Sequence, residues 1–243
     1  MRRLAVCAVA WLTATAPATA AGSLRAPDAK GPLGDERLSN ERTLTRWAHV
    51  GYAAPIRSRP ASDARRVDRL RLFTEDGFPE VYLALRSLRV ERRVWIQVRL
   101  LGRPHGRTGW VPQPALGPLR AVTTLLEVYR RGARAVLRRD GRAIWRARIG
   151  HGAPGTPTPA GRFYIREKLP NVNGSPIYGP WAFGTSAYSS LSDWPGGGVI
   201  GIHGTNQPGL IPGRPSHGCI RVRNRAIRRL VRLMPVGTPV RIR

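Results

Sequence analysis

Short runs of alternating apolar and polar residues, separated by turn-forming residues, dominate most of the chain. In the segment VWIQVRLL the apolar residues would share one face of a strand, and they are Val94, Ile96, Val98 and Leu100. Similar runs return in LLEVYRRG, RAVLRRDGRAIWRARIG and RFYIREKL, each bounded by Gly, Pro or Asp. This pattern predicts a mainly β protein built from two regions of short hairpins.

One segment near the C-terminus has a helical period instead. In RAIRRLVRLM the apolar positions recur with helical spacing, and they are Ile227, Leu230, Val231 and Met234. Asn224 stands directly before this run and suits an N-cap. The arginines would lie on the opposite face of the helix, where solvated charge is a simpler interpretation than contact with DNA.

The start of the chain resembles a processed leader. Residues 1–20, MRRLAVCAVAWLTATAPATA, combine two arginines, an apolar core and a small-residue ending, which predicts a secretory signal peptide. An uncleaved anchor is the alternative, although the apolar stretch is shorter than the ~20 residues that span a bilayer. Residues 21–45 are polar with Pro and Gly, and they predict a linker. Cleavage removes Cys7 and leaves Cys219 as the single cysteine.

The charge of the chain is strongly positive. The sequence has 41 Lys and Arg against 14 Asp and Glu, a formal charge of +27. Such a balance favours a polyanionic partner, and for an exported protein this means cell-wall polymers or lipid headgroups that carry carboxylates or phosphates. Export argues against nucleic acid, and an arginine-rich surface without any partner is the alternative.

The candidate chemistry centres on Cys219 in the segment PSHGCIRVRN. A lone thiol in an oxidising compartment is a liability unless it is buried or its reactivity is used. His203 ends the apolar run VIGIH sixteen residues upstream, and His217 lies two residues away. An imidazole and positive surroundings would lower the pKa of the thiol. Gly218 suggests a tight turn whose N–H groups could face an oxyanion.

Other interpretations of these residues are weaker. The only acidic side chain after Lys168 is Asp193, so we expect the imidazole to be oriented by the Gly204 carbonyl or by Thr205. A zinc site of His203, His217 and Cys219 has an unusual spacing and lacks a fourth ligand, so no metal is expected. A buried, inert cysteine is disfavoured because glycines beside both histidines give backbone access and no packing.

Several motifs together resemble the L,D-transpeptidases, the YkuD-like catalytic domain of bacterial cell-wall synthesis. They are HGT (203–205), SHGCIRVRN (216–224), TPTPAGRFYI (156–165) and AFGT (182–185), and the resemblance covers residues 122–243. It implies a β-sandwich-like catalytic domain with a short helix near the C-terminus.

The resemblance also implies roles for individual residues. Cys219 would be the nucleophile, His203 the proton donor and acceptor, and Gly204 the source of the orienting carbonyl. The backbone of His217, Gly218 and Cys219 would form the oxyanion hole. Three further motif positions would contribute to substrate binding, and they are Ser216, Arg221 and Asn224.

The implied reaction joins peptidoglycan stem peptides. The cysteine would attack the carbonyl of the third stem residue, release D-alanine and form a thioester, which the amine of a neighbouring stem resolves. No cofactor is needed, because the thioester conserves the energy of the broken amide. Water in place of the amine would give an L,D-carboxypeptidase, and a wall-binding protein with little catalysis is a further alternative.

A second resemblance concerns the region before residue 120. WIQVRLLGRPHGRTGWVP (95–112) resembles the closing pattern of bacterial SH3-like domains, a Trp-led strand, a turn and then GWV. We therefore expect a small SH3-like barrel over residues 46–118, followed by the catalytic domain over residues 122–243.

Overall fold

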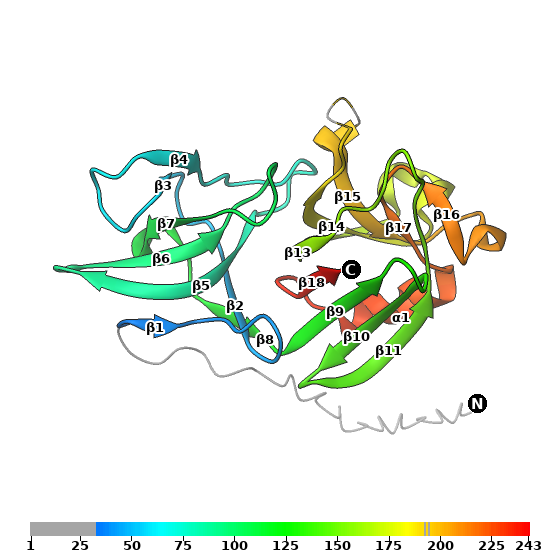
Figure 1. The fold of residues 1–243 in the computed structure, drawn as a ribbon, viewed down its shortest axis with the longest axis horizontal. Helices are drawn as coiled ribbons and strands as arrows, with labels where there is room; N and C mark the ends of the chain where they lie inside the picture. The colour runs from blue at the N-terminus through cyan, green and yellow to red at the C-terminus, as the bar shows by residue number, and fades with distance from the viewer. Residues whose placement is uncertain (1–32, 192, 194) are drawn as a thin grey trace, which may run out of the picture.

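The computed structural model describes residues 33–191, 193 and 195–243, and this part of the protein is mainly β (Figure 1). The predicted signal peptide (1–20) and the first part of the predicted linker lie outside the described residues. Within those residues, no helix is long and apolar enough to cross a membrane. The strands form two sheets that lie side by side, and one α-helix packs on the second sheet.

The first sheet has eight strands in the order β4-β3-β7-β6-β5-β2-β8, with β1 beside β5. The bounds are β1 (Glu36–Arg37), β2 (Thr45–His49), β3 (Pro55–Arg57), β4 (Arg66–Arg69), β5 (Val81–Val90), β6 (Arg93–Arg99), β7 (Thr108–Pro112) and β8 (Arg120–Val122). A short 3-10 turn, η1 (Gln113–Ala115), precedes β8.

The predicted linker over residues 21–45 is wrong from residue 33 onwards. Leu33 and Leu38 are buried in the core of the first sheet, and β1 pairs with β5. Glu41 is buried as well and accepts a hydrogen bond from Arg99 at 2.8 Å. This segment has few apolar residues and no period, so its packing arises from contacts with distant strands that local patterns do not report.

The predicted Trp-led strand and GWV strand are β6 and β7, which pair antiparallel with Ile96 opposite Val111. Ile96, Val98 and Leu100 are buried, as the alternation predicts. An SH3-like barrel is not confirmed, because no pairing of the described strands joins the two edges β4 and β8. The boundary also moves: Val122 ends β8 in the first sheet, so the second sheet begins after it.

The second sheet has ten strands in the order β11-β10-β9-β18-β13-β14-β15-β17-β12-β16. The bounds are β9 (Thr124–Tyr129), β10 (Arg134–Arg139), β11 (Arg142–Arg148), β12 (Gly150–Gly152), β13 (Gly161–Pro170), β14 (Trp181–Tyr188), β15 (Val199–His203), β16 (Gly213–Ser216), β17 (Ile220–Arg221) and β18 (Pro239–Ile242). Four 3-10 turns accompany them, η2 (Val172–Gly174), η3 (Pro176–Tyr178), η4 (Pro195–Gly198) and η5 (Pro208–Leu210).

Helix α1 (Asn224–Leu233) confirms the helical prediction near the C-terminus. Ile227, Leu230 and Met234 are buried in the core of the second sheet. The predicted N-cap at Asn224 is wrong: Arg223 is the N-cap, without a side-chain cap bond, and Asn224 is the first helical residue. The Asn224 side chain bonds to another segment instead, the main chain that follows His203.

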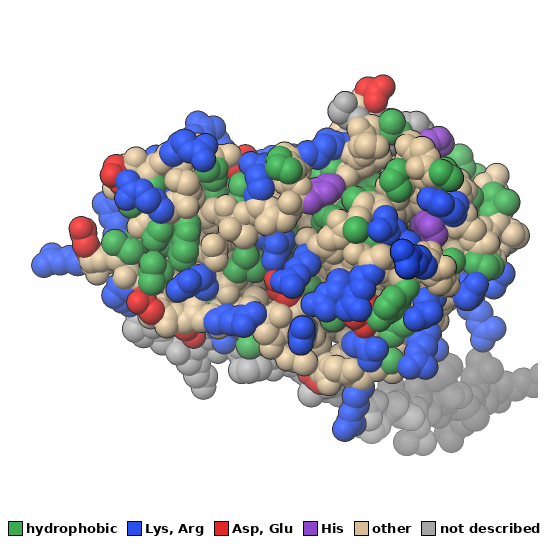
Figure 2. Space-filling view, viewed as in Figure 1, with side chains coloured by type: hydrophobic (Ala, Val, Ile, Leu, Met, Phe, Trp, Pro, Cys, Tyr) green, Lys and Arg blue, Asp and Glu red, His purple; other side chains and the backbone are tan. Residues whose placement is uncertain are grey.

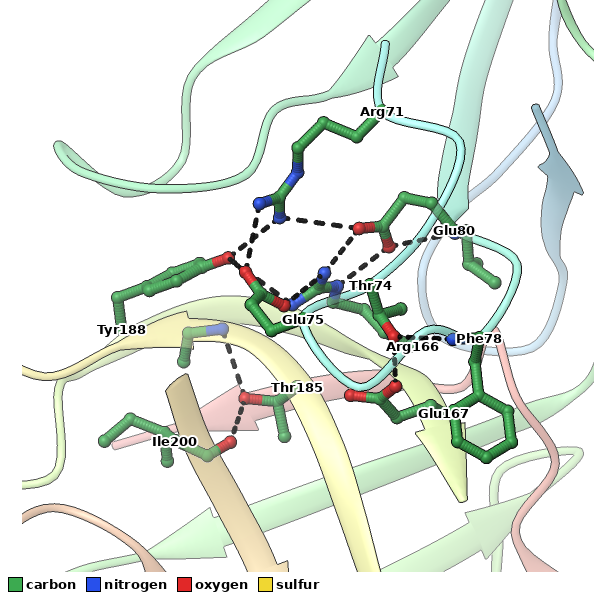
Figure 3. Close-up of polar contacts among 12 residues, drawn as sticks. Arg71, Thr74, Glu75, Phe78, Glu80, Arg166, Glu167, Thr185, Tyr188 and Ile200 are labelled. Carbon is green, nitrogen blue, oxygen red and sulfur yellow. Dashed lines mark hydrogen bonds and ion pairs between the residues drawn. The ribbon is translucent and has the colours of Figure 1, made fainter. Parts of the chain in front are cut away.

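A buried polar network holds the two sheets together (Figure 3). Arg166 of β13 is 1% exposed and donates from Nε to Oε1 of Glu80, which directly precedes β5 of the first sheet, at 2.8 Å. Glu75 lies 2.9 Å from the same guanidinium and accepts a 2.8 Å hydrogen bond from the Tyr188 hydroxyl. Removing one partner of such a buried pair typically costs ~3–5 kcal/mol, so this network fixes the first sheet against β13 and β14.

Candidate active site

The pairing of β15 and β17 brings Cys219 close to the end of β15. The two strands are parallel, with Ile202 opposite Ile220, and both isoleucines are buried. Cys219, which directly precedes β17, is a free, half-buried cysteine. Its Sγ accepts a 3.3 Å hydrogen bond from the Gly201 N–H. The core therefore fixes the backbone on which the thiol is carried.

Gly201 separates the thiol from the imidazole of His203. A Cβ built at Gly201 would lie 3.8 Å from Cys219 Sγ and 3.8 Å from His203 Cδ2, so the two side chains flank the same glycine. The hydrogen bond to Sγ comes from this glycine and not from the imidazole. Catalytic hydrogen bonds often tighten only when substrate is bound. Sequence reasoning missed Gly201, although a glycine inside an apolar strand often marks a close approach.

His203 is 3% exposed and its ring is held from one side. The Nδ1 atom lies 2.6 Å from the Gly204 carbonyl oxygen. A carbonyl can only accept, so Nδ1 carries the proton and Nε2 of the neutral ring has a free lone pair. The ring of Tyr178 meets the imidazole edge to face at 5.0 Å between centroids. Of the two orienting groups expected from the sequence, the structure places the carbonyl there.

Burial decides the charge state of both groups. Burial lowers the pKa of His203 to about 4, and the positive charge of Arg221 lowers it further. The hydrogen bond to the Gly204 carbonyl raises this pKa, but by less than burial lowers it. Burial also raises the pKa of the Cys219 thiol, and this outweighs the lowering by the Gly201 N–H and by Arg221. The sequence-based expectation of a lowered thiol pKa is therefore wrong. The resting pair is a thiol and a neutral imidazole.

The segment that carries the thiol, residues 216–219, forms a tight turn that we call the HGC turn. Gly218 has a φ of +125°, and a Cβ there would lie 2.6 Å from Ile200 Cδ1, so glycine is required. Ser216 Oγ donates to the Cys219 carbonyl at 2.6 Å and accepts from the Gly218 N–H at 3.3 Å. This bond competes with the oxyanion-hole role that the resemblance implies for the Gly218 N–H.

Thr158 holds the HGC turn from the other side. Its Oγ1 donates to the Gly218 carbonyl at 2.6 Å and accepts from the Gly152 N–H at 2.9 Å. Thr158 is fully buried. Sequence reasoning noted the TPTPAG segment but assigned no role to this threonine, because only the tertiary structure shows that it meets Gly218.

The other predicted site residues lie around this centre. His217 is exposed, and its carbonyl accepts a 3.2 Å bond from Ser189 Oγ. Arg221 Nη1 donates to Gln207 Oε1 at 3.0 Å. Asn224 Oδ1 accepts from the Thr205 N–H at 2.8 Å and so fixes the main chain that follows His203. In the described part of the chain, no three His, Cys, Asp or Glu side chains are grouped to hold a metal ion.

Replacing Gly201 with alanine is expected to slow the reaction of the thiol about tenfold or more, while the fold is retained, because enzyme sites tolerate little displacement of reacting groups. The new methyl group would make ordinary contacts with Sγ, with the imidazole and with the Phe183 carbonyl at 3.6 Å. Single-turnover labelling of the thiol, beside a thermal melt, measures both effects. A rate equal to wild type would show that the methyl group does not disturb the pair.

The part of the chain that carries this site is similar to known proteins. Residues 124–242 match the YkuD family model, described as the L,D-transpeptidase catalytic domain. The putative L,D-transpeptidase YkuD of Bacillus licheniformis is 40% identical over 87 residues, which cover 36% of this chain and 46% of the relative. The corresponding protein of Bacillus subtilis is 39% identical over the same shares. The chain thus spans about half the length of the curated relatives it matches.

Solved structures of L,D-transpeptidases are also similar. The catalytic domain from E. faecium L,D-transpeptidase, acylated by ertapenem, is 27% identical and covers 49% of this chain and 96% of its own, with a TM-score of 0.39. An L,D-transpeptidase from Mycobacterium tuberculosis is 12% identical over 80% of this chain and 98% of its own, with a TM-score of 0.45. The family match supports an L,D-transpeptidase catalytic domain in residues 124–242.

Proposed function

We propose that this chain is an exported L,D-transpeptidase that cross-links peptidoglycan stem peptides through a thioester at Cys219. The observation that carries the proposal is that the Cys219 thiol and the His203 imidazole flank Gly201, with Nδ1 of His203 held by the Gly204 carbonyl. The place of action would be the cell wall, the periplasmic space or the medium.

The first half-reaction forms the thioester. As Sγ attacks the carbonyl carbon of the third stem residue, Nε2 of His203 takes the thiol proton. The raised pKa of the thiol makes this transfer necessary, and the lowered pKa of His203 means that the imidazole is unprotonated at neutral pH. The backbone N–H groups of His217 and Cys219 in the HGC turn would stabilise the oxyanion, because the Gly218 N–H is bonded to Ser216 Oγ. The C–N bond then breaks, and His203 returns the proton to the leaving D-alanine amine.

The second half-reaction resolves the thioester. The side-chain amine of a neighbouring stem attacks the thioester carbon and gives a proton to His203. The C–S bond breaks, the proton returns to the sulfur, and a new amide joins two third-position residues. We assign Arg221 to the carboxylates of the substrate, because it lies beside the thiol and its charge acts on both reacting groups. Ser216 and Asn224 are proposed to shape the substrate site through the backbone that they hold.

Incubation of the mature protein with defined tetrapeptide-bearing muropeptides tests the function by product mass. A transpeptidase yields dimers that have lost one D-alanine, without any cofactor. Tripeptide monomers in place of dimers would show that water is the acceptor and that the protein is an L,D-carboxypeptidase. Unchanged muropeptides with a folded protein would contradict both activities and favour a wall-binding role.

A further inference from the structure

A strongly basic pocket lies apart from the reacting pair, on the second domain. It has a volume of about 910 Å³, and no Asp or Glu lines it. Its basic lining residues are Arg130, Arg131, Arg134, Arg214, Arg243 and His151. Figure 2 shows Lys and Arg side chains gathered on this part of the surface, over β9, β10 and β18. The proposed reaction does not use this pocket.

The fold builds the pocket from segments far apart in sequence. The turn between β9 and β10 carries Arg130 and Arg131, and Arg134 begins β10. Arg214 comes from β16 and His151 from β12. Arg130 Nη1 donates to the Thr158 carbonyl at 2.8 Å, and its Nε is buried without a hydrogen-bond partner among the described residues. Buried donors are normally paired in folded proteins, so Arg130 Nε can donate to an anion bound in the pocket.

Little negative charge in the described structure offsets these arginines. Glu127, outside the pocket, pairs with Arg243 at 3.1 Å and with Arg138 at 2.7 Å. No carboxylate side chain of the described residues lies within ion-pair distance of Arg130, Arg131, Arg134 or Arg214. Arg134 stacks over the ring of Tyr129 at 4.6 Å, and Arg214 Nε donates to the Gly152 carbonyl at 3.2 Å. Four arginines therefore line one cavity, and none of them has a carboxylate side chain of the described residues within ion-pair distance.

We propose that this basic pocket binds consecutive phosphates of a phosphodiester polymer of the cell envelope. Guanidinium groups bind phosphate through paired N–H donors, and several of them in one cavity suit a ligand with repeated charges. The volume is near the upper end of the ~300–1,000 Å³ typical of ligand cavities, which is more than one small anion fills. The choice of an envelope polymer rests on the export assumed in the proposed function.

The pocket is also connected to the reacting groups. Arg130 holds the Thr158 carbonyl, and the Thr158 hydroxyl holds the Gly218 carbonyl of the HGC turn. A polymer bound here would keep the enzyme on the wall, and Thr158 alone would link Arg130 of the pocket to the HGC turn. The pocket thus acts as an anchor for the catalytic domain.

A pair of double variants with equal charge loss tests this site. Arg131→Gln/Arg134→Gln removes two exposed pocket arginines that do not contact Thr158, and Arg92→Gln/Arg93→Gln removes two exposed arginines at the β5–β6 turn. Binding of a poly(glycerol phosphate) oligomer is measured by calorimetry at several salt concentrations. The pocket variant is expected to lose about tenfold or more in affinity, and the slope of log K against log salt should fall by about 2. The control variant is expected to change less than about twofold.

Two further probes identify the ligand class. A poly-glutamate of equal charge should bind more weakly, and the pocket variant should change its binding little; a similar loss with this probe would reassign the pocket to carboxylates and overturn the proposal. A larger loss with an oligothymidylate would indicate nucleic acid instead, and equal losses in both double variants would show that only net charge matters. Binding needs no turnover, so these results are independent of whether Cys219 acts as a nucleophile.

Discussion

Cross-link formation is expected to disappear when Cys219 is replaced with alanine, while the fold stays intact. The thiol lies across Gly201 from the buried imidazole, and its Sγ accepts a hydrogen bond from the Gly201 N–H. Its neighbours Ile220 and Val222, not the sulfur, fill the core. Product mass with tetrapeptide muropeptides measures the loss, and near-UV circular dichroism with a thermal melt checks the fold.

Cys219→Ser is the matched variant for this experiment. It keeps the size of the side chain and a hydroxyl, whose higher pKa makes it a poor nucleophile beside an imidazole, so it should also be inactive. Turnover by either folded variant at a rate comparable with wild type would contradict the assignment of the nucleophile.

Replacing His203 with glutamine is expected to slow thioester formation by about 10²–10⁴, the range for loss of a general base. The expected loss is large because burial raises the pKa of Cys219, so the thiol cannot ionise unaided near neutral pH. Single-turnover acylation separates this step from the later attack by the amine. His217→Ala is the matched control, because that ring is exposed while His203 is buried.

The pH dependence of acylation gives a second readout of His203. Its pKa is lowered to about 4 by burial, so the imidazole loses its function as a base only when the pH falls towards 4. The wild-type rate should therefore decline below about pH 5, and His203→Gln should lack this decline. A decline that persists in His203→Gln, or a larger loss in His217→Ala than in His203→Gln, would move the role of base to His217.

Local patterns in the sequence were sufficient for much of the fold. Alternation identified β6, and helical spacing identified α1, because both elements bury one face against a core. The run VIGIH and the spacing to Cys219 also suggested that His203 arrives from a neighbouring strand, and β15 does lie beside β17. These features depend on the periodicity of apolar residues and on the number of residues between two positions, and both can be read directly from a sequence.

The predictions that were wrong concern residues whose contacts come from segments far away in the sequence. Leu33 and Leu38 pack on strands that follow much later, so their segment resembled a linker. Asn224 bonds to Thr205 and not to its own helix. The pKa of Cys219 depends on how deeply the two strands bury it, which the presence of His203 and the arginines in sequence could not indicate. Gly201 and Thr158 gained roles only through contacts with the HGC turn.

The central claim is that Cys219 forms a covalent acyl-enzyme. A carbapenem presents a strained, activated carbonyl that a thiolate beside backbone N–H donors can open, so it is a suitable acyl donor for this test. Intact-protein mass followed by peptide mapping should find one carbapenem adduct on Cys219 of the mature protein, none on Cys219→Ala, and slower formation in His203→Gln. An adduct on a serine or lysine, or no adduct on folded protein that turns over muropeptides, would contradict the account.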